Sequence, residues 1–489
     1  MANKDIAVII LAAGLGKRMK SDLPKVLHPV AGRPMLFYPI EVVKSLGIEK
    51  VVIIVGYKTE EVINALQEGR SRGPAPAGFK QGSEVRSQNN PQIQFVKQEP
   101  QLGTGHAVLC VEDTLKDWKG NILILSGDVP LITRETILGL LDLHEKKKAT
   151  ISFISAIVED PSNYGRIARD KKNSVVKIIE DKDASEREKA INEINTGIYC
   201  ISAPFLFSSL KKIKKENAQG EYYLPDLIAI AAREKKKVAC LTHINPAEVM
   251  GINNRIELAQ ANGVMRERIN SELMLSGVTL IDPATTYIHY GVKIGRDTTI
   301  YPNVFLEGDT NIGEMCIIEE GCKIINSSVG DGSVIKSHSV IESSNIGQKV
   351  SIGPFARLRP ECVIEDKARI GNFVEIKKSK IGKGSKANHL SYIGDAIIGK
   401  DVNIGAGTIT CNYDGIKKHQ TIIEDGAFIG SDTQLVAPVK VGKNAYIGSG
   451  STITKNVPSG SLALSRPEQR VIEGWVEKKG LKKIERQKK

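Results

Sequence analysis

Short apolar runs alternate with amphipathic stretches through the first half of the chain. The runs have the length of single strands and lie at Ala7–Leu11, Val51–Val55, Ile122–Leu125, Ile151–Ile157, Ile198–Ile201 and Val238–Leu241. Stretches with helical spacing of apolar residues lie at Pro34–Leu46, Thr133–Lys148 and Tyr222–Arg233. Strands that alternate with helices predict an α/β domain with a mainly parallel sheet.

The second half of the chain has a different pattern, in which an aliphatic residue recurs every six positions. Three series show it: Ile294, Ile300, Leu306, Ile312, Ile318, Ile324; Val334, Val340, Ile346, Ile352, Leu358, Ile364, Ile370, Ile376; and Ile423, Ile429, Leu435, Val441, Ile447, Ile453. This spacing predicts a parallel β-helix whose aliphatic side chains point into a three-sided core. The pattern breaks at Ser327–Ser333 and at Cys411–Gln420, where we expect loops that bulge out.

Between these halves, residues Arg255–Ser276 carry apolar residues at helical spacing and predict a linker helix. We therefore expect a first domain at 1–255, a linker helix at 256–276 and a β-helix domain with a basic tail at 277–489. The segment Gly69–Asn90 is rich in Gly, Pro, Ser and charge, which predicts a surface loop or insertion.

Composition and charge narrow the class of protein. The 489 residues carry a net charge of +12, but Arg470–Lys489 alone holds eight Lys or Arg against three Glu. No nucleic-acid recognition motif accompanies this charge, so we expect no nucleic-acid partner. The seven cysteines are scattered, and no apolar run has the length of a membrane span. We expect a cytoplasmic protein without membrane insertion, whose tail around Trp475 either covers the end of the β-helix or is solvated.

A glycine-rich turn follows the first apolar run. It contains Gly14, Gly16 and Arg18, and Lys25 comes shortly after it. Backbone N–H groups of such a turn and two nearby cations suit a triphosphate, although a simple strand-to-helix turn with solvated cations has the same composition. Asp128 ends another apolar run, where it would either hold Mg²⁺ or cap a turn.

The β-helix half carries polar residues that a repeat does not need. His389 lies close in sequence to Lys377, Lys386, Tyr392 and the acid Glu375. Histidine is the usual proton acceptor near neutral pH, although a lone histidine on a repeat surface is often inert. Arg359 and Lys377 would supply cationic contacts to a phosphate.

Further motifs occur in a fixed order, namely Gln101–His106, Tyr164–Arg166, Glu180–Asp183, Asn195–Gly197 and Gly251–Arg255. With the glycine turn and the hexapeptides, they make the chain resemble the bifunctional N-acetylglucosamine-1-phosphate uridyltransferase/glucosamine-1-phosphate N-acetyltransferase family. The resemblance implies a Rossmann-like α/β nucleotidyltransferase domain followed by a left-handed parallel β-helix of hexapeptide repeats. It also implies a cytoplasmic homotrimer that acts on UTP, sugar phosphates and acetyl-CoA in cell-wall and lipopolysaccharide precursor synthesis.

The resemblance assigns roles in the first site. Arg18 and Lys25 would neutralise the triphosphate, and Asp128 and Asn253 would hold Mg²⁺. The residues expected to bind UTP or the UDP-sugar are Leu11, Ala12, Ala13, Gly14, Lys25, Gln98, Gly103, Thr104, Ser126, Gly127, Asp128, Gly165, Glu180, Asn195 and Asn253. Ser126 stands where many relatives carry an aromatic residue.

The resemblance also assigns roles in the second site, where His389 would be the general base and Glu375 would orient it. The residues expected to bind glucosamine phosphate are Arg359, Lys377, Tyr392, Asn403 and Lys418. The residues expected along the acetyl-CoA path are Ala406, Asn412, Tyr413, Ser431, Ser449 and Arg466. Ser449 stands where we expect Ala in relatives.

Two other readings fit parts of the sequence. One is a nucleotidyltransferase with a single activity and a structural or regulatory β-helix, which would have no need of His389 between Lys386 and Tyr392. The other is a non-catalytic assembly subunit, in which we would expect Arg18, Lys25 and Asp128 to be eroded. All three residues are present.

Overall fold

A computed structural model describes residues 5–67 and 92–479. The predicted insertion Gly69–Asn90 lies outside the described residues, as does the tail after Lys479. The chain forms two compact units, one of Met1–Leu273 with Tyr287–Val292 and one of Met274–Thr286 with Lys293–Lys489. The helix predicted between the halves is present as α9 (Arg255–Leu275), whereas the domain limits predicted from the sequence stay a prediction.

The first unit is built on a sheet whose strands include all six predicted runs. Its main path has the order β11 (Val238–His243), β7 (Ile151–Ile157), β10 (Glu193–Ser202), β6 (Asn121–Ser126), β1 (Ile6–Ala12), β4 (Lys50–Val55) and β5 (Gln92–Lys97). Strand β1 pairs parallel with β4 and β6, whereas β10 runs antiparallel to both β6 and β7. A side branch adds β8 (Arg166–Arg169) and β9 (Val175–Ile179). The predicted mainly parallel sheet is therefore confirmed.

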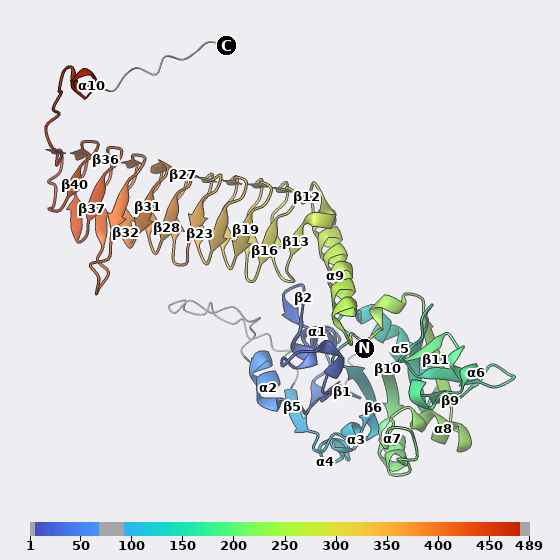
Figure 1. The fold of residues 1–489 in the computed structure, drawn as a ribbon. Coiled ribbons are helices and arrows are strands. Elements are labelled where there is room, and N and C mark those ends of the chain that lie inside the picture. The colour runs from blue at the N-terminus through green and yellow to red at the C-terminus, as the bar shows by residue number, and fades with distance from the viewer. Residues whose placement is uncertain (1–4, 68–91, 480–489) are drawn as a thin grey trace. The chain divides into compact units, whose positions relative to one another are not determined.

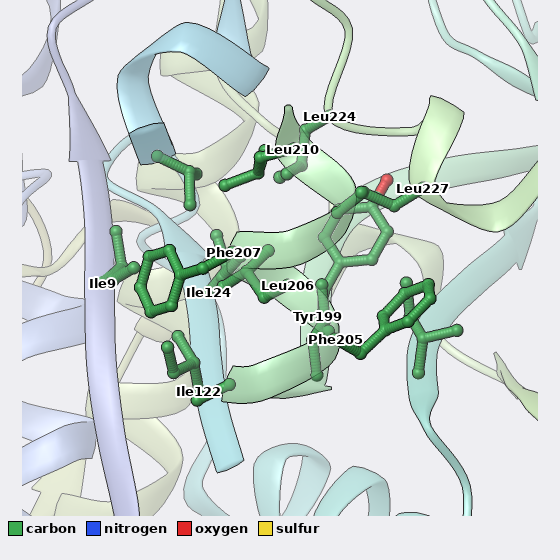
Figure 2. Close-up of a cluster of buried hydrophobic side chains, with 14 of the residues drawn as sticks. Ile9, Ile122, Ile124, Tyr199, Phe205, Leu206, Phe207, Leu210, Leu224 and Leu227 are labelled. Atoms are coloured by element: carbon green, nitrogen blue, oxygen red, sulfur yellow. The ribbon is translucent and has the colours of Figure 1, made fainter. Parts of the chain in front are cut away.

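Helices cover both faces of this sheet because its strands are apolar on both sides. Along β1, Ala7 and Ile9 belong to one buried cluster and Val8 and Ile10 to the other. The first cluster includes residues of α3 (Thr104–Leu109), α7 (Ala203–Leu210) and α8 (Asp226–Arg233). The second includes residues of α1 (Phe37–Ser45), α2 (Thr59–Gln67) and α5 (Arg134–Lys146). Figure 2 shows the first cluster gathered around the aromatic side chains of α7.

The second unit is a parallel β-helix whose short strands, visible in Figure 1, run from β12 (Thr279–Leu280) to β41 (Leu462–Ala463). Each coil contributes one strand to each of three parallel sheets, so that residues at one position stack coil upon coil. Ile352, Ile370, Ile404 and Ile429 form one such buried column. The predicted hexapeptide β-helix is therefore confirmed.

The predicted phase of the repeat is wrong in one coil. Val334 and Val340 are only half-buried, and their successors Ile335 and Ile341 fill the core. The cause is a pair of corners one residue shorter than the six-residue repeat, because Val329 follows Ile324 by five positions and Ile346 follows Ile341 by five. Ile318 consequently pairs with Ile335 rather than with a residue 18 positions later.

The two predicted loops have different outcomes. Ser327–Ser333 contains no bulging loop but the short corner itself and β20 (Ser328–Val329). There Ser327 is buried and its Oγ accepts a hydrogen bond of 3.0 Å from the backbone N–H of Ser344 in the next coil. The predicted loop at Cys411–Gln420 is present between β34 (Ile409–Cys411) and β35 (Thr421–Ile423), with a bridge between Tyr413 and Lys418.

Within residues 5–67 and 92–479, every helix is too short or too polar to cross a lipid bilayer.

Candidate functional site

The first candidate site lies at the carboxyl edge of the sheet, where parallel strands commonly present ligand-binding residues. Leu11 of β1 pairs with Ser126 of β6, and the Gly127 N–H donates to the Leu11 carbonyl oxygen at 2.9 Å. The Gln101 amide nitrogen donates to the Ala13 carbonyl oxygen at 2.6 Å. The predicted phosphate loop, Leu11 to Gly14, therefore adjoins the segment Ser126–Asp128.

Gly16 brings Lys25 against this loop. It has a φ of +61°, and a Cβ at this position would lie 2.7 Å from the Cβ of Lys25. Only glycine satisfies both the left-handed backbone and this close approach. The Lys25 side chain is consequently directed along the edge of the sheet.

Lys25, Asp128 and Asn253 meet although they are far apart in sequence. Lys25 Nζ forms an ion pair with the Asp128 carboxylate and donates to Asn253 Oδ1 at 2.7 Å. The segment that carries Asn253 is fixed by the Ile252 N–H, which donates to the Asp128 carbonyl oxygen at 2.9 Å. Two oxygen atoms thus converge on one cation, the Lys25 ammonium, and the role of Asp128 and Asn253 as Mg²⁺ ligands stays a prediction.

Arg18 is exposed on the short helical turn Lys17–Met19. Its charge acts on Tyr164, together with those of Glu257 and Asp128, although burial is the main reason that the pKa of the Tyr164 hydroxyl is raised. The Tyr164 hydroxyl donates to the Gly251 carbonyl oxygen at 3.2 Å. Arg18 therefore faces the same part of the edge as Lys25 and Asp128.

Gly165, Glu180 and Asn195 form a second pocket on the same edge. A Cβ on Gly165 would lie 3.3 Å from Glu180 Oε1 and 3.5 Å from the Asn195 Cβ. Burial, together with the nearby acids Asp183 and Asp226, raises the pKa of Glu180 to about 7. The three residues that the sequence assigned to the sugar are thus neighbours.

Buried Arg166 supports this pocket, and the sequence analysis gave it no role of its own. It is only 2% exposed, donates to the Tyr164 carbonyl oxygen and pairs with Asp181 at 2.9 Å. Its position inside the motif Tyr164–Arg166 could have indicated a role for Arg166 from the sequence. Ser126 also adjoins the pocket, since a Cβ on Gly197 would lie 3.2 Å from Ser126 Oγ.

The remaining predicted nucleotide residues lie beyond β4 and β5. The Gln98 N–H donates to the Val55 carbonyl oxygen at 2.8 Å, which places Gln98 at the carboxyl end of β4. Its amide nitrogen donates to the Gly103 carbonyl oxygen at 2.9 Å. Thr104 Oγ1 accepts from the Leu224 N–H at 3.1 Å. Gln98, Gly103 and Thr104 therefore share one corner of the edge.

The second candidate site is a column along one edge of the β-helix. Asn372, at the end of β27 (Arg369–Asn372), pairs in register with His389, at the end of β30 (Lys386–His389). The same register continues through the next three coils. It brings Ala406, Ser431 and Ser449 into line with His389. Arg466 closes the column, because its Nη1 donates to the Ser449 carbonyl oxygen at 2.6 Å.

His389 is exposed, and its Nδ1 lies 3.0 Å from the Asn372 side-chain oxygen. The sequence analysis assigned the orienting role to Glu375, but Glu375 pairs with Arg359 at 3.1 Å instead. Asn372 lies on the same sheet as His389, whereas Glu375 lies on the neighbouring sheet, and the orienting role of Glu375 stays a prediction. Asn372 precedes His389 by one coil, and this spacing could have predicted their contact from the sequence.

Cationic and polar residues flank the column. Tyr392 pairs in register with Glu375, one coil after Glu375 and Lys377 and two coils after Arg359. The ammonium of Lys377 lowers the pKa of Lys418, which the Cys411–Gln420 loop brings beside it. Two adjacent ammonium groups suit a phosphate.

Three residues complete the predicted set. Asn412 donates to the Asp395 carboxylate, Tyr413 is exposed at the start of the loop, and Asn403 faces outward on β33 (Asn403–Ile404).

Comparisons with known families agree with this division. A family named Nucleotidyl transferase matches residues 7–245, one named GMPPB C-terminal domain matches 283–367, and one named Bacterial transferase hexapeptide matches 420–455. A solved putative glucose-1-phosphate thymidylyltransferase from Bacillus anthracis shares 19% identity over 54% of this chain and 96% of its own, with a TM-score of 0.39, which is too low to support an argument.

Curated relatives match almost end to end. Proteins named Bifunctional protein GlmU share 48% identity in Pelobacter propionicus, 49% in Geotalea daltonii and 47% in Shouchella clausii. Each match covers 96% of this chain and 98% of the relative. On this similarity, together with the matches to the Nucleotidyl transferase and Bacterial transferase hexapeptide families, the chain belongs to the family of bifunctional GlmU proteins and is a bifunctional transferase with a nucleotidyltransferase unit and a hexapeptide transferase unit.

Proposed function

We propose that the chain acetylates glucosamine-1-phosphate with acetyl-CoA and then transfers UMP from UTP to the product, giving UDP-N-acetylglucosamine and pyrophosphate. The main support for this proposal is that each unit brings together one set of predicted polar residues. In the first unit Lys25 meets Asp128 and Asn253, and in the second unit the predicted residues line the His389 column. A single-activity protein would need only the first set.

In the uridyl transfer, a phosphate oxygen of N-acetylglucosamine-1-phosphate attacks the α-phosphorus of UTP. The new P–O bond forms as the bond to pyrophosphate breaks, and the attacking oxygen is already anionic, so no general base is required. Lys25 and Arg18 neutralise the charge of the triphosphate, and the pocket of Gly165, Glu180 and Asn195 orients the sugar. Positioning and electrostatic stabilisation carry this step.

The residues present fit a Mg²⁺ ion. Asp128 and Asn253 supply two oxygen atoms that already share one cation, the Lys25 ammonium, and Mg²⁺ prefers a carboxylate with water and phosphate oxygens. Among the described residues, no cluster of three or more His, Cys, Asp or Glu side chains offers a complete protein cage. When bound, the ion would neutralise phosphate charge during the transfer.

In the acetyl transfer, the amine of glucosamine-1-phosphate attacks the thioester carbonyl carbon of acetyl-CoA. The C–N bond forms and the C–S bond breaks, and coenzyme A leaves as the thiol. Because Asn372 Oδ1 can only accept, His389 Nδ1 carries the proton and donates to it. The free Nε2 of His389 then accepts the amine proton, while Arg359, Lys377 and Lys418 hold the phosphate.

A homotrimer would complete this site. Phe355, Phe373 and Leu390 are 49%, 57% and 62% exposed and stack along the corner beside the His389 column. All three have positive φ values, 54°, 53° and 46°, which are costly for large side chains. An exposed apolar corner next to the catalytic column supports a contact with a second copy of the chain. UTP and acetyl-CoA as substrates would favour a cytoplasmic location.

The test supplies purified protein with acetyl-CoA, glucosamine-1-phosphate, UTP and Mg²⁺, and follows free thiol and pyrophosphate separately. When N-acetylglucosamine-1-phosphate is added as well, we expect His389→Ala to abolish thiol release and to leave pyrophosphate release intact. Asp128→Ala should block only pyrophosphate release when N-acetylglucosamine-1-phosphate is supplied. Pyrophosphate without any thiol from the wild type would reject the acetyl transfer.

A further inference from the structure

The side-chain amide of Gln98 is held by two acceptors. Its Nε2 lies 2.9 Å from the Gly103 carbonyl oxygen and 3.2 Å from the Nδ1 of His106. A carbonyl oxygen can only accept, so the amide nitrogen and not the amide oxygen must face Gly103. The same nitrogen then requires a lone pair on His106 Nδ1.

His106 is built to provide that lone pair. With Nδ1 unprotonated, the ring proton lies on Nε2, which is 4.0 Å from the Cys110 sulfur. The ring stacks on Tyr222 with centroids 6.3 Å apart, which fixes its plane. Burial, and then the nearby charge of Lys215, lower the pKa of His106, which favours the neutral imidazole.

This arrangement leaves one polar atom of the Gln98 side chain for a ligand. Gln98 is only 5% exposed, and within the described residues its carbonyl oxygen accepts no hydrogen bond. The residue therefore offers an acceptor and no donor. Uracil presents N3–H, which can donate to such an oxygen, whereas cytosine presents an unprotonated N3 whose lone pair would be repelled.

We propose that His106 is a positioning residue that sets the choice of nucleobase, because it holds the Gln98 amide with its oxygen toward the base. The inference rests on the proposed function, in which Gln98 lines the nucleotide site. His106 itself touches no reacting atom. It acts by preventing the amide from turning over, which would present Nε2 to the base and admit cytosine.

The test compares UTP and CTP as substrates of the full chain for nucleotidyl transfer to N-acetylglucosamine-1-phosphate. It measures kcat and KM separately for each nucleotide. His106→Phe keeps the ring and its stack on Tyr222 but removes the acceptor. We expect the ratio of kcat/KM for UTP over CTP to fall about fivefold to tenfold, the weight of one neutral hydrogen bond. KM for UTP should rise, and kcat for CTP should increase. His106→Asn places an acceptor oxygen near the position of Nδ1 and should restore most of the ratio.

Gln98→Leu distinguishes the role of His106 from the contact between Gln98 and the base. If Gln98→Leu lowers the ratio but His106→Phe leaves it within about twofold of the wild type, the role of His106 is overturned and the nucleotide site stands. If Gln98→Leu leaves the ratio unchanged, the base does not contact Gln98, and the proposed nucleotide site fails along with the inference.

A measurement on the unmodified protein guards against variants that fold poorly. Nitrogen NMR of the histidine rings at pH 7 should show His106 as the neutral tautomer protonated on Nε2. A proton on Nδ1, in either the neutral ring or the imidazolium, would overturn the inference, because Gln98 Nε2 would then face a second donor.

Discussion

The Nδ1 of His389 lies 3.0 Å from the side-chain oxygen of Asn372, one coil earlier on the same edge of the β-helix. If His389 is the general base, as proposed, this contact favours a proton on Nδ1 and leaves Nε2 as the proton acceptor. The side chain that orients His389 would then be an amide supplied by the stacking of the repeat.

Removing this amide should slow acetyl transfer without affecting the other site. We expect Asn372→Ala to lower kcat for thiol release about tenfold to a hundredfold, since His389 loses its fixed tautomer and orientation. Pyrophosphate release from supplied N-acetylglucosamine-1-phosphate should not change. The exposed Asn311, at an outward position far along the repeat, provides the control Asn311→Ala. An Asn372→Ala variant with unchanged thiol release would contradict this role.

Removal of divalent metal should divide the two activities. The only oxygen pair that we assign to Mg²⁺ lies in the first unit, at Asp128 and Asn253. Excess EDTA should therefore stop pyrophosphate release and leave thiol release intact, and added Mg²⁺ should restore the first. Parallel loss of both activities in EDTA would show that the metal has a role in the second unit as well.

Glu180 should make the stability of the first unit fall with rising pH. Its pKa of about 7 in the folded protein exceeds the ordinary value of 4.5, so between these values the folded chain keeps a proton that the unfolded chain releases. The free energy of unfolding should decrease across this window, by at most about 3 kcal/mol, and level off above pH 7.

Glu180→Gln should remove this dependence. We would measure the free energy of unfolding in urea from pH 4 to pH 8, and take the difference between wild type and variant to cancel other carboxylates. The exposed Glu216, 79% accessible, supplies Glu216→Gln as the matched control. A wild-type-minus-Gln difference that is flat over this range would contradict the raised pKa.

The short corners of the β-helix should depend on buried serines. Ser327→Ala removes the acceptor of the buried Ser344 N–H, and an unsatisfied buried donor costs about 1–3 kcal/mol. The neighbouring Ser328 bonds only the exposed side chain of Asn345, so Ser328→Ala should cost less than about 0.5 kcal/mol. Thermal unfolding of the two variants would compare them directly, and equal stabilities would contradict the importance of the corner bond.

The sequence predicted both folds because each has its own period. Alternating runs marked the strands of the sheet, and the six-residue spacing marked the β-helix. The spacing misplaced Val334 and Val340, because the corner between Ile341 and Ile346 is one residue short and counting by six through Ile346 does not detect it. The true inward residues, Ile335 and Ile341, are equally aliphatic, so composition did not distinguish them.

Site residues on one local motif were easier to predict than contacts between distant segments. Lys25, Asp128 and Asn253 were each assigned through the resemblance, but Lys25 meets the other two across 103 and 228 residues of the chain. Asn372 was not assigned a role, because its position next to His389 follows only from the number of residues in one coil. Glu375 received the orienting role through the resemblance, and its strand lies on the sheet next to that of His389.

The regular stacking of coils also fixes the distances between residues along the His389 column. Strands of neighbouring coils are about 4.8 Å apart, so Ser449, three coils beyond His389, lies about 14 Å from it along the edge. The distance between His389 and Arg466 along the edge is thus set by whole coils. If acetyl-CoA binds along this column, as proposed, insertion or deletion of one coil between Ala406 and Ser449 would change the length of acyl carrier that fits by one coil spacing.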